Sequence, residues 1–341
     1  MPSIEHPKAL VTGGAGFIGS HLVDRLLTDG NDVVVIDNFS RGSRDNLRAA
    51  VAHPRLTVHE MDVLDLPSHI GMMGKIESFF HLAGRADIVS SIANPQPYFR
   101  DNLDGTIATL EAARSAGVKR FIYAASISCY GIPDRYPTPE TAPLRPQYPY
   151  ALSKYLGEEC VLHWWQVYGL PVISLRLPNV YGPRVRSLCA YGAVVGVFLA
   201  QKLAGQPLTI VGDGTQTRDF TFISDVVDSF IAAARSPLSG KVFNVGSGMP
   251  HSVNYLAQLV GGPVVHIPKR PGEPPQTFAD ITRISRVLGW RPKVSFAEGV
   301  GIMLQEIESW HGALVWTPSS IARATEDWFR YLQPRSAMET A

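Results

Sequence analysis

The chain has few cysteines, and neither acidic nor basic residues are in large excess. Its three cysteines, Cys129, Cys160 and Cys189, lie far apart without metal-ligand spacing, and an odd number cannot all pair with one another. This argues against a disulfide framework and a zinc site, and suits a reducing cytoplasm. The 31 Lys and Arg residues nearly balance 30 Asp and Glu residues, a formal net charge of +1. Without a strong overall field, nucleic acid and membrane partners are not expected.

Long hydrophobic runs are missing as well. No apolar stretch reaches the roughly 18 residues of a membrane helix, and the N-terminal MPSIEHPK has no apolar segment of the kind found in signal peptides. We therefore expect an unprocessed cytoplasmic protein, whose 341 residues suffice for one large domain or two.

Short β-branched runs alternate with helix-length segments in the first half of the chain. The runs are KALVTGG, NDVVVID, RLTVHEMD, IESFFHLAG, KRFIYAAS and VISLRLPN. Strands separated by helices form βαβ units, and runs that are apolar on both faces are typical of buried parallel strands. The sequence therefore predicts an α/β fold built on a Rossmann-type doubly wound parallel sheet.

From Tyr181 onward, glycine, proline and turn residues separate shorter elements, which predicts a smaller, mixed α/β C-terminal substrate lobe. The segment DFTFISDVVDSFIAAARS has helical apolar spacing and is predicted to return to the first lobe. We assign residues 1–177 and about 219–246 to the Rossmann domain, and 178–218 and about 247–335 to the second domain. A terminal packing helix is expected over about 319–332.

A glycine-rich turn follows the first predicted strand directly. Gly13, Gly16 and Gly19 are spaced three apart and open a predicted helix, whose N-terminus would attract phosphates. The second strand ends at Asp37, 24 residues after Gly13, where an acid can accept from a ribose 2′-hydroxyl. This order of elements predicts a dinucleotide site. The carboxylate favours NAD over NADP, although Arg41 lies close by.

A tyrosine and a lysine lie one turn apart on a later predicted helix. The segment YALSK places Tyr150 four residues before Lys154, on one face. A phenol is a poor base at neutral pH, but a nearby ammonium and a nicotinamide cation both favour the phenolate. Ser126 ends a predicted parallel strand and would open into the same crevice. The three residues together predict a hydride-transfer site.

At this point the sequence resembles a known family, the extended short-chain dehydrogenases/reductases, and within it the UDP-galactose 4-epimerase-like nucleotide-sugar enzymes. The resemblance covers nearly the whole chain. Beyond the glycine turn and YALSK, its motifs are DNFS from Asp37, HLAG from His81, the segment 126–131, RLPNVYGPR from Arg176, GDGTQTRDF from Gly212 and RPGE from Arg270.

The resemblance implies a role for each matched position. Tyr150 would be the base, Lys154 would hold the nicotinamide ribose and tune Tyr150, and Ser126 would bond the reacting hydroxyl. The implied cofactor-binding residues are Gly13, Gly16, Phe17, Ile18, Gly19, Asp37, Asn38, Ser40, Asp62, Val63, Leu82, Ala83, Gly84, Asn102, Tyr150 and Lys154. The implied substrate-binding residues are Ser126, Ser128, Tyr150, Asn179, Arg218, Arg270 and Glu273.

The implied reaction is epimerisation of a nucleotide-diphosphate sugar at C4, through a transient 4-keto sugar and with tightly bound NAD. Related 4,6-dehydratases have an acid pair after the Ser126 equivalent, and related glucuronate decarboxylases have a glutamate at the second place. This chain has Ile127 and Ser128 there, which argues against both reactions. In 3,5-epimerising relatives a cysteine occupies the Ser128 position. Cys129 is one place later, and on a strand that shift would turn its side chain into the core.

At two positions the sequence differs from the epimerases that it resembles, and both differences concern the substrate. Pro178 replaces an aromatic residue that many epimerases place against the nucleotide, and Thr277 replaces a bulky tyrosine that in some restricts the C2 substituent. The smaller Thr277 suggests room for an N-acetyl group. Glucose, N-acetylglucosamine and glucuronate forms of a UDP-hexose are the leading substrates, and a heptose or a GDP-, CDP- or dTDP-linked sugar stays open.

Two other functions use the same residues. A net NAD(P)-dependent 4-reductase or dehydrogenase would consume cofactor stoichiometrically, and a non-catalytic NAD-sensing binding protein would share the fold. The resemblance also implies a homodimer, joined by helices near 102–116 and 150–168. The apolar Val161, Trp164 and Trp165 suit that contact but suit packing on the sheet equally.

Overall fold

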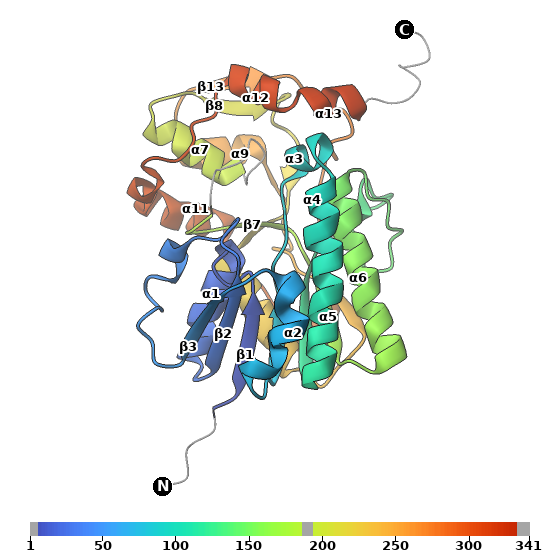
Figure 1. Cartoon of the computed structure of the whole chain (residues 1–341). Coiled ribbons are helices and arrows are strands. Elements are labelled where there is room, and N and C mark those ends of the chain that lie inside the picture. Colours follow the sequence, from blue (N-terminus) through green and yellow to red (C-terminus); the bar gives the residue numbers. More distant parts are fainter. Residues whose placement is uncertain (1–5, 186–193, 333–341) are drawn as a thin grey trace.

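The computed structural model describes residues 6–185 and 194–332. Its centre is a seven-stranded parallel sheet in the order β3-β2-β1-β4-β5-β6-β11 (Figure 1). The strands are β1 (Lys8–Thr12), β2 (Asp32–Asp37), β3 (Leu56–Glu60), β4 (Ser78–His81), β5 (Arg120–Ser126), β6 (Val172–Leu177) and β11 (Lys241–Asn244). The predicted doubly wound parallel sheet is confirmed.

The order of strands reverses between β1 and β4. The chain moves from β1 outward to β2 and β3, and then returns to place β4 on the other side of β1. At such a switch point the carboxyl ends of the two central strands leave a crevice between their connections. The glycine turn after Thr12 and the HLAG turn after His81 both lie at this point.

Helices cover both faces of the sheet. On one face, α1 (Phe17–Thr28) packs against α8 (Ile223–Arg235), and both contribute to the larger hydrophobic core. On the other face lie α2 (Leu66–His69), α5 (Gly105–Ala116) and α6 (Pro149–Tyr168), with a second core beneath them. The helix α8 therefore lies beside the first helix of the chain.

Smaller elements gather above the carboxyl ends of the strands, at the top of Figure 1. Two-stranded sheets pair β8 (Leu208–Val211) with β13 (Val264–Ile267), β7 (Asn179–Tyr181) with β10 (Phe220–Phe222), and β9 (Thr217–Arg218) with β12 (His251–Ser252). The helices of this region are α7 (Val194–Leu203), α9 (Val253–Val260), α10 (Thr282–Leu288) and α11 (Phe296–Gln305). Residues 276–279 of this region face the segment that follows β5 across a shared hollow.

The C-terminal segment forms two short helices instead of the single predicted one. These are α12 (Pro318–Ala324) and α13 (Glu326–Tyr331). The break falls at Thr325, whose hydroxyl donates to the Ile321 carbonyl at 2.8 Å and competes with the helical backbone. Helix α13 packs on α3 (Ile88–Ala93), which precedes α4 (Gln96–Phe99). Within residues 6–185 and 194–332, no helix is long and apolar enough to cross a membrane.

Candidate active site

The N-terminal turn of α6 carries the predicted base. Pro149 occupies the first turn, where a missing N–H costs nothing, and Tyr150 follows it. The phenol of Tyr150 is half-buried and lies near the hydroxyls of Ser126 and Ser128. Burial raises the pKa of Tyr150, and the two serine hydroxyls lower it in part. The phenol is therefore placed for proton transfer but is protonated at neutral pH until a positive charge lies nearby.

The two serines that reach Tyr150 are joined to each other. The Ser128 backbone N–H and hydroxyl donate to Ser126 Oγ at 3.2 and 2.8 Å. Ser126 is the last residue of β5 and caps a 3₁₀ turn over Ile127–Tyr130. Because the turn begins at the strand end, both hydroxyls lie at the carboxyl edge of the sheet.

Lys154 lies one turn along α6 from Tyr150 and is almost fully buried. Its ammonium nitrogen is 4.2 Å from the centroid of the Tyr123 ring. Burial lowers the pKa of Lys154 to about 7, and the carboxylate of Glu158, a further turn along, raises it in part. The proton on this amine is thus easily lost, and its retention depends on neighbouring negative charge.

A buried ion pair that the sequence did not reveal lies directly behind Lys154. Arg176 on β6 donates to Glu158 on α6, with Nη2 to Oε1 at 2.5 Å and Nε to Oε1 at 3.0 Å. Glu158 also accepts from Ser174 at 2.6 Å, and Arg176 donates to the Tyr130 hydroxyl at 2.7 Å. This pair joins the helix that carries Lys154 to the turn that carries Ser126. The only sign of this pair in the sequence is that Glu158 follows Lys154 by four residues, as Lys154 follows Tyr150.

The glycine turn fits a cofactor phosphate group. Gly13 has φ +69°, and a Cβ there would lie 2.7 Å from the Ala83 backbone nitrogen. A Cβ on Gly19 would overlap the Gly13 carbonyl oxygen. Gly16 caps α1 without a side chain, so no capping side chain covers the N–H groups of Phe17 and the residues after it. The two loops therefore approach closely while the helix end stays accessible to an anion.

Asp37 connects the end of β2 to this turn. Its carboxylate accepts from the backbone N–H of Ala15 at 2.9 Å and of Phe39 at 2.8 Å. Burial raises the pKa of Asp37, while these hydrogen bonds lower it in part. The carboxylate therefore orders the glycine turn and still has lone pairs for ribose hydroxyls.

The other predicted cofactor residues line the same edge. Asn38 donates to Asp62 at 3.2 Å and accepts from the hydroxyl of Ser40 at 2.7 Å. Val63 is buried directly after Asp62, and Leu82 continues the pairing of β4 by donating to the Thr12 carbonyl at 3.1 Å.

Asn102 is the buried residue of a π-helical turn over Arg100–Asp104. Its amide accepts from the Arg85 N–H at 2.7 Å and donates to Ser153 Oγ at 2.9 Å. A Cβ on Gly84 would overlap its Oδ1 atom. Asn102 therefore holds the turn that follows β4 against α6, next to Lys154.

Two arginines and a glutamate meet on the opposite side of the crevice. Arg218 Nη2 lies 2.6 Å from Glu273 Oε1, and Arg270 Nη1 lies 3.8 Å from Glu273 Oε2. All three side chains are about nine-tenths buried. The planar donor groups of the two arginines suit the oxygens of a diphosphate. Glu273 also lines a hollow of about 270 Å³ with Val211 and Gln216.

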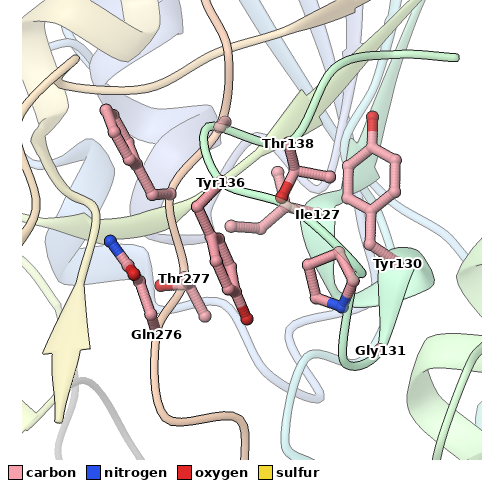
Figure 2. Close-up of a pocket in the computed structure, with 10 residues that line it drawn as sticks. Ile127, Tyr130, Gly131, Tyr136, Thr138, Gln276 and Thr277 are labelled. Carbon is pink, nitrogen blue, oxygen red and sulfur yellow. The ribbon is translucent and has the colours of Figure 1, made fainter. Parts of the chain in front are cut away.

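A second, shallow hollow, of about 20 Å³, lies between the segment after β5 and residues 276–279. Figure 2 shows Ile127 and Tyr136 lining it, opposite Gln276 and Thr277. The Thr277 hydroxyl donates to the Asn179 side chain at 3.2 Å. The structure thus brings Asn179 and Thr277 together beside the turn that begins at Ser126.

Asp219, which the sequence did not single out, holds in place the segment 276–279 that lines the smaller hollow. It is fully buried and accepts from Ser247 N–H at 2.6 Å, Ser247 hydroxyl at 2.7 Å and Ala279 N–H at 3.2 Å. Its signal was only its place after Arg218 in the GDGTQTRDF motif.

Cys129 is buried, but not for the predicted reason. Residues Ile127–Tyr130 form a 3₁₀ turn and not a strand, so the argument from alternating strand faces was wrong. The thiol is 2% exposed, and burial raises its pKa to about 12. A thiol in that state is a poor acid or nucleophile. The third cysteine, Cys189, lies outside the described residues.

Comparison with known proteins identifies the class. Residues 9–246 match the model of the NAD dependent epimerase/dehydratase family. The chain is 39% identical over 303 residues to a UDP-glucose 4-epimerase of Mycolicibacterium smegmatis, covering 86% of this chain and 96% of that protein.

Two solved structures of epimerases are also similar to most of this chain. A UDP-glucose 4-epimerase from Thermotoga maritima, determined with UDP-glucose, superposes with a TM-score of 0.81 at 35% identity, covering 89% of this chain and 99% of that one. A UDP-N-acetylglucosamine 4-epimerase from Methanobrevibacter ruminantium, in complex with UDP-N-acetylmuramic acid, has a TM-score of 0.84 at 31% identity, covering 90% and 99%. The chain belongs to the NAD-dependent epimerase/dehydratase family.

Proposed function

We propose that this protein interconverts the C4 epimers of a UDP-hexose with tightly bound NAD. The observation that carries the proposal is that Tyr150, at the start of α6, lies near Ser126 and Ser128, at the end of β5, with buried Lys154 one turn away. The relatives named above are epimerases of UDP-sugars. The same position in 4,6-dehydratases carries the acid pair that Ile127 and Ser128 replace here.

In this reaction Tyr150 takes the proton of the C4 hydroxyl while Ser126 holds the oxygen. NAD, held by the glycine turn, Asp37 and Lys154, would supply the acceptor and donor of the C4 hydride when bound, and the 4-keto sugar would take the hydride back on its opposite face. Lys154 holds the nicotinamide ribose and, as an ammonium, favours the Tyr150 phenolate. Tyr150 then returns its proton to the C4 oxygen, which leaves the enzyme unchanged and requires no external redox partner.

The diphosphate would lie between Asn179 and the two arginines. Arg218 and Arg270 supply the positive charge, and Glu273 keeps the two guanidinium groups together and accepts from the nucleoside ribose. The hollow beside Glu273 is the proposed nucleoside site. Thr277 lines the smaller hollow near Ile127, and we propose that it leaves room for an N-acetyl group at C2.

We also propose an assignment of residues to two domains and a cellular compartment. We assign residues 1–177 and about 219–246 to cofactor binding, and 178–218 and about 247–335 to the nucleotide sugar. In support, α8 packs on α1 and β11 pairs with β6. Free thiols at Cys129 and Cys160 suit a reducing cytoplasm.

For a homodimer we propose the face of α5 and α6. Trp164 Nε1 already donates to Glu111 on α5 at 2.7 Å, so Trp164 packs within one chain. Trp165 and Tyr168 on α6 are 37% and 52% exposed and offer apolar surface for a second copy.

The proposal is tested with purified protein, catalytic NAD and separate UDP-glucose, UDP-N-acetylglucosamine and UDP-glucuronate, followed by NMR of the anomeric protons. Appearance of the galacto epimer without loss of mass supports 4-epimerisation, and Tyr150→Phe serves as the inactive control. Stoichiometric NADH consumption on a 4-keto sugar would instead indicate a reductase. Tight NAD binding with every sugar unchanged would refute the UDP-hexose assignment.

A further inference from the structure

The C-terminal helix α13 contacts both proposed halves of the site through one side chain. Trp328 is 1% exposed, and its Nε1 donates to the Pro271 carbonyl at 2.7 Å. The guanidinium of Arg270 lies 5.9 Å from the Trp328 ring centroid. The indole therefore packs beneath the loop that carries Arg270 and bonds to its backbone.

On its other side the same ring faces the start of α6. The Tyr148 ring is 6.1 Å from Trp328, and it stacks on the Tyr150 ring at 6.4 Å with an angle of 5° between planes. Tyr148 is the N-cap residue of α6. A continuous row of aromatic rings thus runs from the C-terminal helix to the proposed base.

Helix α13 is itself held on the cofactor side of the crevice. It packs on α3, which follows the HLAG turn by a few residues. The ring is too deeply buried to touch a substrate, so any effect it has must pass through the residues it supports.

We propose that Trp328 is a positioning residue that sets Arg270 at a fixed place relative to Tyr150, and so tightens binding of the nucleotide diphosphate. An arginine side chain loses much rotamer freedom when it binds a phosphate, and a rigid ring beneath it removes part of that cost beforehand. Aromatic packing also keeps the guanidinium plane oriented. This inference rests on the proposed function, because the role of Arg270 belongs to it.

The test compares Trp328→Phe and Trp328→Leu with Trp310→Phe and Trp310→Leu. Trp310 is a matched control because it is also buried in the C-terminal segment but packs on Gly196 of α7. Three quantities are measured on the NAD-loaded enzyme: the Kd for UDP by calorimetry, kcat and KM for UDP-glucose, and the amount of NAD retained. Thermal unfolding measures how far each substitution lowers the stability of the fold.

Trp328→Phe keeps a ring but loses the donor to Pro271, and we expect the UDP Kd and the KM to rise about fivefold. Trp328→Leu loses the ring as well, and we expect about thirtyfold. In both variants kcat should stay within about twofold and NAD retention should not change. The Trp310 variants should lower the melting temperature but leave Kd and KM at wild-type values.

Equal Kd and KM values in Trp328→Phe, Trp328→Leu and wild type would overturn the inference, as would equal rises in the Trp328 and Trp310 variants. Wild-type protein that binds no UDP would refute the proposed function together with this inference. Wild-type protein that binds UDP, with Trp328 variants that bind it as well, would overturn the inference alone.

Discussion

The buried pair of Arg176 and Glu158 yields the sharpest prediction on stability. Their side chains are 5% and 1% exposed. In Arg176→Met the Glu158 carboxylate loses the Nε and Nη2 donors and keeps the Ser174 hydroxyl at 2.6 Å. An uncompensated buried charge of this kind costs about 3–5 kcal/mol. We therefore expect the free energy of unfolding to fall by about 4 kcal/mol.

Urea unfolding of the NAD-free protein, followed by tryptophan fluorescence, measures this change. The partner variant Glu158→Leu and the double variant complete a cycle. The double variant should cost at least about 2 kcal/mol less than the sum of the single variants, because neither charge is then left alone. Arg25→Met is the control, since the Arg25 pair with Asp228 is partly exposed and should contribute less than about 1 kcal/mol.

Two results would refute this reasoning. The first is an Arg176→Met variant within about 1 kcal/mol of wild type, which would mean that water or a rearrangement satisfies Glu158. The second is additivity in the cycle, which would mean that the two charges act independently.

Further predictions concern the site. Tyr150→Phe should lower kcat about 10²- to 10⁴-fold with NAD retention unchanged, as measured by turnover and by cofactor release. Glu158→Gln removes the charge that raises in part the pKa of Lys154, which burial lowers to about 7, so its kcat/KM relative to wild type should fall as the pH rises towards about 7 and level off above it; a constant ratio would contradict this. Gly19→Ala should abolish NAD retention because its Cβ overlaps the Gly13 carbonyl, whereas normal NAD content would count against the tight turn. Native Cys129, with its pKa raised to about 12, should resist iodoacetamide until urea is added, and rapid labelling mapped by mass spectrometry would disprove its burial.

Local sequence patterns predicted much of the fold because they depend on neighbouring residues. Buried parallel strands need apolar residues on both faces, and all six predicted strands form β1 to β6. The spacing of four that predicted Tyr150 and Lys154 on one helix face is confirmed in α6. The secondary-structure prediction failed in two short segments that could each form more than one local structure. Ile127–Tyr130 forms a turn because Ser126 caps it, and the C-terminal helix breaks where Thr325 bonds its own backbone.

The sequence by itself determined the parallel sheet, the glycine turn with Asp37, and the Tyr150, Lys154 and Ser126 set, since each follows from periodicity or from a short motif. Only the tertiary structure decided which distant residues support them. Arg176 lies 18 residues from Glu158, and Trp328 lies 57 residues from Pro271. No local pattern records such contacts, because burial removes both partners from water only after separate segments have packed.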